Sequence, residues 1–152
     1  MIPKFRAWDK EKSRMIYPST LDVCFELEDD GINILDVSEE YPEDHVFPRI
    51  DSVLMQSTGF KDNNDTEVFE GDVINIHWFY ADFDPVELGA FENEEYAERV
   101  IVKKEFGNFG FWWEEADSWV DLATLAMSAR LDEESFEILG NIYANPELLS
   151  NP

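Results

Sequence analysis

The sequence predicts a mainly β fold, all-β or α+β, for this chain of 152 residues. Short runs in which apolar and polar residues alternate follow one another closely, which is typical of strands with one buried face. Glycine, proline, asparagine and aspartate separate these runs, and such residues favour turns. The chain is also 44% hydrophobic and 14% aromatic, so it can build a core. Because the runs do not alternate with long helical segments, we expect a small barrel or sandwich rather than a parallel α/β sheet.

Two pairs of alternating runs predict two β-hairpins in the first part of the chain. A charged turn separates the runs of the first pair, and Asp29-Asp30-Gly31 separates those of the second. A stretch with two prolines and four acidic residues then predicts a loop. The runs are residues 4–8 and 14–17, then 21–27 and 32–37, and the loop is residues 38–48. Together they define an N-terminal β-rich segment over residues 1–57.

The second part of the chain, residues 58–152, is expected to form a small barrel with short helical segments. β-Branched and aromatic residues fill both faces of residues 73–80, which is typical of a central strand. The acidic stretch at about 81–97 is expected to be an insertion, and residues 92–98 are expected to form one or two helical turns. The spacing of apolar residues over 122–131 predicts a short helix. The other expected strands are residues 52–56, 67–69, 99–106, 109–113, 118–122 and 136–143, with a hairpin turn at Gly107-Asn108. One domain over residues 1–152 is the alternative.

Three segments of the chain resemble a known family. They are Ile-Pro-Lys-Phe-Arg-Ala-Trp-Asp at residues 2–9 with Arg14-Met15, the segment from Leu54 to Ile74, and Phe-Glu-Ile-Leu-Gly-Asn-Ile-Tyr-Ala-Asn-Pro-Glu-Leu at residues 136–148. In this order they resemble the YopX family of bacteriophage and prophage proteins. The resemblance implies a phage-encoded, non-structural protein of a bacterial cytoplasm, and it implies no catalytic residues.

Two short segments in the middle of the chain can be compared with known patterns. In the YopX pattern an Asn-Gly turn usually lies where this chain has Asn64-Asp65. In addition, Glu-Gly-Asp-Val-Ile at residues 70–74 resembles the strand that opens SH3-like barrels. That likeness implies an SH3-like barrel over about residues 67–143, and it carries no function with it.

The charge of the chain excludes several function classes. With 35 acidic and 11 basic side chains, the formal net charge is −24, which repels phosphate backbones and anionic lipids. Ordinary nucleic-acid binding and membrane attachment are therefore not expected. No run of 18 apolar residues occurs, and Cys24 cannot form an intramolecular disulfide because it is the only cysteine. We expect a cytoplasmic protein.

The residues offer no recognisable catalytic or metal chemistry. An EF-hand register begun at Asp62 fails, because Glu67 stands where the invariant glycine belongs and Val73 where the bidentate glutamate belongs. Cys24 and His77 lie in apolar strands, where both are more typical of structural roles. We therefore expect no catalytic residue, no metal site and no cofactor, and the chain is not expected to be an enzyme.

Aromatic and basic residues supply the candidate contacts with a partner. Trp112 and Trp113 are neighbours on an expected strand, so they must face opposite sides. One of them is then exposed, covered by a partner, or covered by the chain's own residues 80–97. The aromatic cluster before the acidic stretch and the basic N-terminus are further candidates. The candidate partner-binding residues are Lys4, Arg6, Trp8, Trp78, Tyr80, Phe83, Trp112 and Trp113.

The leading hypothesis is a non-enzymatic accessory protein that binds protein. Five of the eleven basic residues lie within the first 14 positions, and residues 62–98 contain no lysine or arginine. This asymmetry favours contact between copies, and hence a homo-oligomer, with a host protein as a further partner. The alternative is an acidic DNA mimic that inhibits a host nucleic-acid enzyme. Direct nucleic-acid binding through the basic N-terminus is a third, weaker hypothesis.

Overall fold

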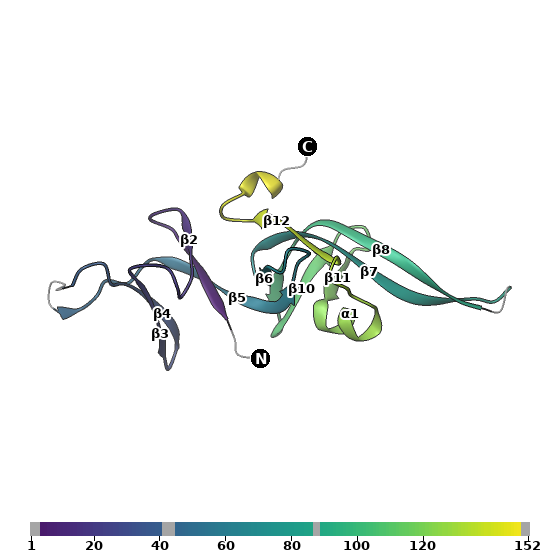
Figure 1. Cartoon of the computed structure of the whole chain (residues 1–152), viewed down its shortest axis with the longest axis horizontal. Coiled ribbons are helices and arrows are strands. Elements are labelled where there is room, and N and C mark those ends of the chain that lie inside the picture. Colours follow the sequence, from purple (N-terminus) through teal and green to yellow (C-terminus); the bar gives the residue numbers. More distant parts are fainter. Residues whose placement is uncertain (1–3, 41–44, 87–88, 150–152) are drawn as a thin grey trace. The chain divides into compact units, whose positions relative to one another are not determined.

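The computed structural model describes residues 4–40, 45–86 and 89–149, and it confirms the mainly β prediction (Figure 1). The chain forms two compact units, Met1–Ser57 and Thr58–Pro152, called here the first and second units. Both units are built mainly from antiparallel strand pairs.

The first unit contains the two predicted hairpins. Strand β1 (Phe5–Asp9) pairs with β2 (Arg14–Ile16) on one side and with the start of β5 (Ser52–Lys61) on the other. Strands β3 (Val23–Glu28) and β4 (Gly31–Asp36) form the second hairpin across a two-residue turn. A small apolar core joins the hairpins and consists of Ala7, Ile16, Val23 and Ile34.

The second unit is built from two three-stranded sheets and a short helix. One sheet has the order β12-β7-β8 and the other the order β11-β10-β9, while β6 (Glu67–Phe69) pairs with the end of β5. The strands are β7 (Asp72–Asp84), β8 (Gly89–Ile101), β9 (Lys103–Glu105), β10 (Asn108–Trp113), β11 (Ser118–Asp121) and β12 (Phe136–Asn141). Helix α1 (Leu122–Ser128) follows β11, and a 3-10 turn, η2 (Pro146–Leu149), follows β12.

A single apolar cluster fills the second unit. The largest of its fully buried side chains come from β7, β10, α1 and β12, so both sheets and the helix contribute to it. These side chains are Ile74, Ile76, Phe111, Leu122 and Phe136. The helix begins where the sequence predicts, because the Asp121 carboxylate accepts hydrogen bonds from the backbone N–H groups of Ala123 and Thr124.

The prediction of helical turns in residues 92–98 is wrong. Strand β7 continues to Asp84, and β8 begins at Gly89 and pairs with it along its length. Figure 1 shows the two strands running together away from α1 as one long ribbon. Glutamate has low intrinsic strand preference, so the acidic run gave no strand signal. Pairing with the strongly β-forming residues of β7 outweighs that preference.

The turn between β9 and β10 lies one residue earlier than predicted, at Phe106-Gly107. Both residues have positive φ, 51° and 82°, as a tight two-residue hairpin turn requires. Glycine adopts this conformation freely, but phenylalanine does so at a cost. The Phe106 side chain is fully exposed.

At the turn Asn64-Asp65, the second residue adopts the left-handed backbone conformation that glycine would favour. Asp65 has φ of 64°, in the left-handed region. The buried carboxylate of Asp62 stabilises this turn, because its Oδ1 accepts hydrogen bonds from the N–H groups of Asn64 and Thr66 at 2.9 and 2.8 Å. Asp62 therefore acts as a turn residue.

Candidate docking surfaces

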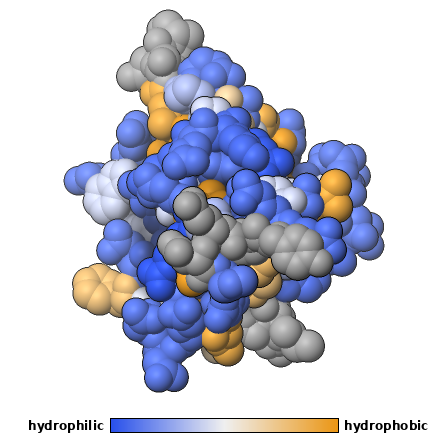
Figure 2. All heavy atoms as spheres, turned by 90° about the vertical axis from the view of Figure 1, so that its left-hand side faces the viewer, coloured by the Kyte–Doolittle hydropathy of each residue, from blue (hydrophilic) through white to orange (hydrophobic). Residues whose placement is uncertain are grey.

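Two of the five basic side chains of the N-terminus, Lys10 and Arg14, lie close to carboxylates of the first unit. Arg6 is only 5% exposed, and Trp8 is half-buried on the same strand, whereas Lys4 is exposed. Lys10 forms an ion pair with Asp51 at 3.5 Å. Arg14 approaches Asp9 at 3.6 Å. Carboxylates of the same unit therefore offset part of the positive charge that the sequence places here. The face of the molecule in Figure 2 is mostly hydrophilic, with hydrophobic residues scattered over it.

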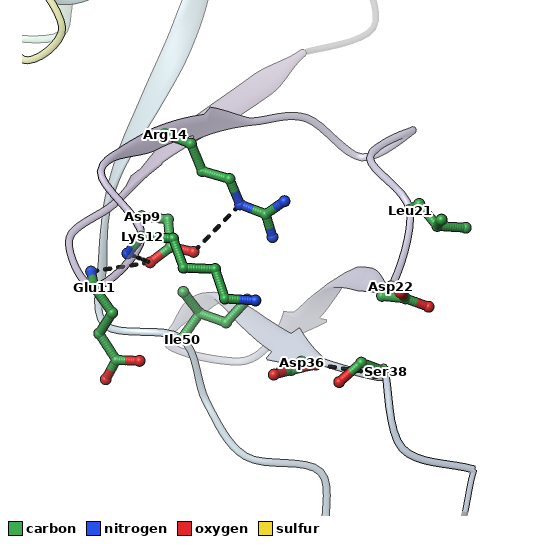
Figure 3. A pocket seen from close by; sticks show the side chains of 9 residues that line it. All are labelled: Asp9, Glu11, Lys12, Arg14, Leu21, Asp22, Asp36, Ser38 and Ile50. Carbon is green, nitrogen blue, oxygen red and sulfur yellow. Dashed lines mark hydrogen bonds and ion pairs between the residues drawn. The ribbon is translucent and has the colours of Figure 1, made fainter.

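A pocket of about 180 Å³ opens in the first unit (Figure 3). The Asp9 carboxylate, which is buried, forms part of its wall and closes the β1–β2 turn. Its Oδ1 accepts hydrogen bonds from the backbone N–H groups of Glu11 and Lys12 at 3.0 and 3.2 Å. Figure 3 shows the side chains of Arg14 and Lys12 pointing into the pocket. The lining residues are Asp9, Glu11, Lys12, Arg14, Leu21, Asp22, Asp36, Ser38 and Ile50.

Charges of both signs meet across this pocket. Hydrogen bonds from the side chain and backbone of Ser38 lower the pKa of Asp36 below its ordinary value, and the positive charges of Lys12 and Arg14 add to this effect. The lining contains four carboxylates and two cations. The lining residues include no histidine and no cysteine.

Strand β10 presents its two tryptophans to opposite sides, as predicted. Trp113 faces inward, and its ring centroid lies 5.1 Å from that of Trp78, which is only 6% exposed. Trp112 faces outward and is 47% exposed. It pairs with Trp119 on β11, so the two indoles share the outer face of this sheet.

Gly110 makes this outer face possible. A Cβ atom at Gly110 would lie 2.7 Å from Cζ2 of Trp119 and would also overlap the backbone oxygen of Val120. The Trp119 indole therefore lies directly over the glycine backbone, beside Trp112. We call Gly110, Trp112 and Trp119 the tryptophan face.

The other predicted aromatics lie along the β7–β8 hairpin. Tyr80 is half-buried and packs against the core, whereas Phe83 is 57% exposed. Phe91, on the neighbouring strand, is also exposed. The sites predicted in the second unit thus divide into core residues, Trp78 and Trp113, and surface residues, Phe83 and Trp112.

Arg130 covers part of the hairpin. Its guanidinium lies 4.2 Å from the ring centre of Phe79, which suits a cation–π contact. The same group donates two hydrogen bonds to the Glu92 carboxylate, at 2.7 and 3.2 Å. These bonds lower the pKa of Glu92 below its ordinary value. Arg130 therefore joins both strands of the hairpin to the segment that follows α1.

Sequence patterns did not single out Trp119, Gly110 and Arg130 as site residues. A turn placed at residues 114–117 would have paired Trp112 with Trp119, because antiparallel partners across a hairpin share a face. Arg130 is the only basic residue after Lys104, in a part of the sequence rich in acidic residues. Its position alone among them indicates an ion pair.

Two searches of the described residues gave negative results. In residues 4–40, 45–86 and 89–149, no three histidine, cysteine, aspartate or glutamate side chains are grouped so that they could hold a metal ion. In the same part of the chain, no helix has the length and apolar character needed to cross a membrane.

Comparisons with known proteins place the chain in a family. The YopX protein family matches residues 4–150. Among solved structures, protein EF1440 from Enterococcus faecalis is similar to the chain, with 26% sequence identity, coverage of 99% of each chain and a TM-score of 0.51. A comparison with curated proteins gives no match. Because the family match spans nearly the whole sequence, the chain belongs to the YopX family.

Proposed function

We propose that the chain is a non-enzymatic, phage-encoded accessory protein of the bacterial cytoplasm, and that it binds another protein through the tryptophan face. One observation carries the proposal: Trp112 and Trp119 lie together on an outer sheet face, and a glycine beneath them makes room for the second indole. Paired tryptophans on a surface are costly in water and are typical of the centres of protein interfaces.

The sheet gives these side chains the rigidity that a docking site needs. Trp112 and Trp119 pair across β10 and β11, and the inward neighbours Phe111 and Trp113 fix β10 in the core. A partner would therefore meet preformed aromatic anchors with little loss of side-chain entropy. A second copy of the chain or a host protein could be that partner.

The geometry supports protein docking better than DNA mimicry. Mimicry needs carboxylates in a row on one face, as phosphates lie along a duplex strand. In β8, Glu92 and Glu94 lie on one face and Glu95 on the other, because side chains of a strand alternate. Glu92 is also engaged by Arg130. The acidic hairpin is therefore not a one-sided array.

Substitution of Trp112 tests the proposal. The comparison is between the wild type, Trp112→Ser and Leu27→Ser, whose side chain is exposed in the first unit. Light scattering over a dilution series first shows whether the partner is a second copy. Crosslinking in bacterial lysate, followed by purification and titration of the captured protein, then tests a host partner.

Loss of an aromatic anchor should weaken the interaction by about 2 kcal/mol or more, roughly thirtyfold in dissociation constant. Leu27→Ser should bind as the wild type does. The proposal fails if all three proteins remain monomeric and capture nothing, or if Trp112→Ser and the wild type bind the same partner equally.

A further inference from the structure

Strand β8 forms an open edge of its sheet. The sheet has the order β12-β7-β8, so within the described part of the chain no strand pairs with the outer side of β8. This strand is 13 residues long, and most of its side chains from Gly89 to Tyr96 are exposed. A long open edge is a template for a further strand.

The pairing of β7 shows which backbone groups of β8 point outward. The N–H groups of His77 and Phe79 donate to Ser135 and Arg130, on the side of β7 away from β8. The backbone N–H and C=O groups of successive residues in a strand point to opposite sides. Those of Trp78 and Tyr80 therefore point toward β8. Their partners there are Glu95 and Asn93.

It follows that the alternate residues of β8 offer their backbone N–H and C=O groups to the outside. These residues are Ala90, Glu92, Glu94 and Tyr96. The regular edge ends at a bulge beyond Ala97, where Arg99 has φ of 51° and donates its N–H to Asn75 Oδ1 at 3.0 Å. The edge can therefore accept one short strand of regular geometry.

The charge along this edge selects the kind of strand. Glu94 and Glu95 flank it beside Glu92, whose carboxylate already binds Arg130, and residues 62–98 contain no lysine or arginine. A second copy of β8 would place like charges side by side, which destabilises strand pairing. A segment with lysine or arginine at alternate positions would place opposite charges there instead.

We propose that β8 binds an extended basic segment of a partner protein, which adds as a fourth strand to the sheet β12-β7-β8. Main-chain hydrogen bonds hold the segment, and ion pairs with the glutamates select it. This inference rests on the proposed protein-binding function and names the chemistry of the partner, but it uses a surface other than the tryptophan face.

Synthetic peptides test the inference directly. The probe is a fluorescent peptide in which lysine alternates with valine, and its control has proline in place of each valine. Both carry the same charge, but proline lacks the N–H that a strand ladder needs. Anisotropy titrations with the full chain are made at low and at moderate salt.

Two variants locate the site on β8. Ala90→Pro removes one outward N–H group without a change of charge, and Glu94→Gln removes one charge without loss of a backbone donor. The lysine–valine peptide should bind at least about tenfold more tightly than the proline peptide. Each variant should bind the lysine–valine peptide severalfold more weakly than the wild type does. Circular dichroism should show that both variants remain folded.

The inference is overturned if the valine and proline peptides bind equally, since binding would then follow charge alone. It is also overturned if the lysine–valine peptide does not bind at low salt, or if both variants bind it as the wild type does. The Trp112→Ser variant separates the two proposals. It should bind the lysine–valine peptide as the wild type does. If the peptide does not bind to the chain at all, the test of the tryptophan face still stands.

Discussion

Replacement of glycine by alanine usually changes protein stability little. Gly110→Ala should be strongly destabilising, because the Trp119 indole lies in close contact with Gly110. Ordinary carbon–carbon contacts lie at about 3.5–4.0 Å. The new Cβ would lie 2.7 Å from Cζ2 and 2.9 Å from Cε2 of Trp119, so the indole would have to move by roughly 1 Å. The Val120 backbone oxygen is also too close, and it belongs to the strand that pairs with β10.

Gly110→Ala should therefore lower the free energy of unfolding of the second unit by about 2–4 kcal/mol. Overpacking contributes about 1–3 kcal/mol, and a weakened hydrogen bond between β10 and β11 contributes about 1 kcal/mol. Urea unfolding followed by tryptophan fluorescence measures this change. The indole N–H resonance of Trp119 should shift as well.

Gly89→Ala is the matched control, because a Cβ atom at Gly89 meets nothing within 4 Å. This variant should change stability by less than about 1 kcal/mol, with a gain expected from the stiffer unfolded chain. Equal stability of the two alanine variants would refute the reasoning, since it would show that the indole does not lie over Gly110 in solution.

Three other predictions concern carboxylates. Asp9→Ala should destabilise the first unit by about 1–3 kcal/mol in chemical denaturation, because it leaves two turn N–H groups without their acceptor. Ser38→Ala should raise the pKa of Asp36 toward its ordinary 3.8, as followed by NMR. Because the folded pKa is depressed, the stability from Asp36 is present above its unfolded pKa and is lost as the pH falls through the folded value. Arg130→Ala should raise the pKa of Glu92 toward 4.5, and an unchanged pKa would show that their bond does not form in solution.

Local patterns were sufficient to predict most of the strands. Alternation predicted β1 to β4 and β10, and apolar spacing predicted α1, because each of these elements has one face in the core of its own unit. Strand β8 was missed for the converse reason. Between Gly89 and Tyr96 its side chains are mostly exposed on both faces of the strand. No alternation of apolar residues therefore marks this part of β8 as a strand.

The candidate surface could be predicted only in part. The rule that neighbours on a strand face opposite sides predicted that Trp112 and Trp113 separate. It could not say which tryptophan is buried, since that depends on contact between Trp113 and Trp78, which are distant in sequence. The place of Trp119 over Gly110 is likewise a cross-strand contact, and it requires the register of β10 and β11.

The acidic charge and the long hairpin are best understood together. A strand with an open edge and exposed backbone groups would pair with other copies unless something opposed it. In β8 the opposing feature is negative charge, since Glu94 and Glu95 lie beside the edge. Charge that opposes pairing between two β8 edges also attracts a basic strand, so solubility and selective binding need not be alternative explanations for it. The carboxylates that flank the open edge of β8 are therefore the ones that bear on partner binding. Carboxylates elsewhere on the surface say much less about it.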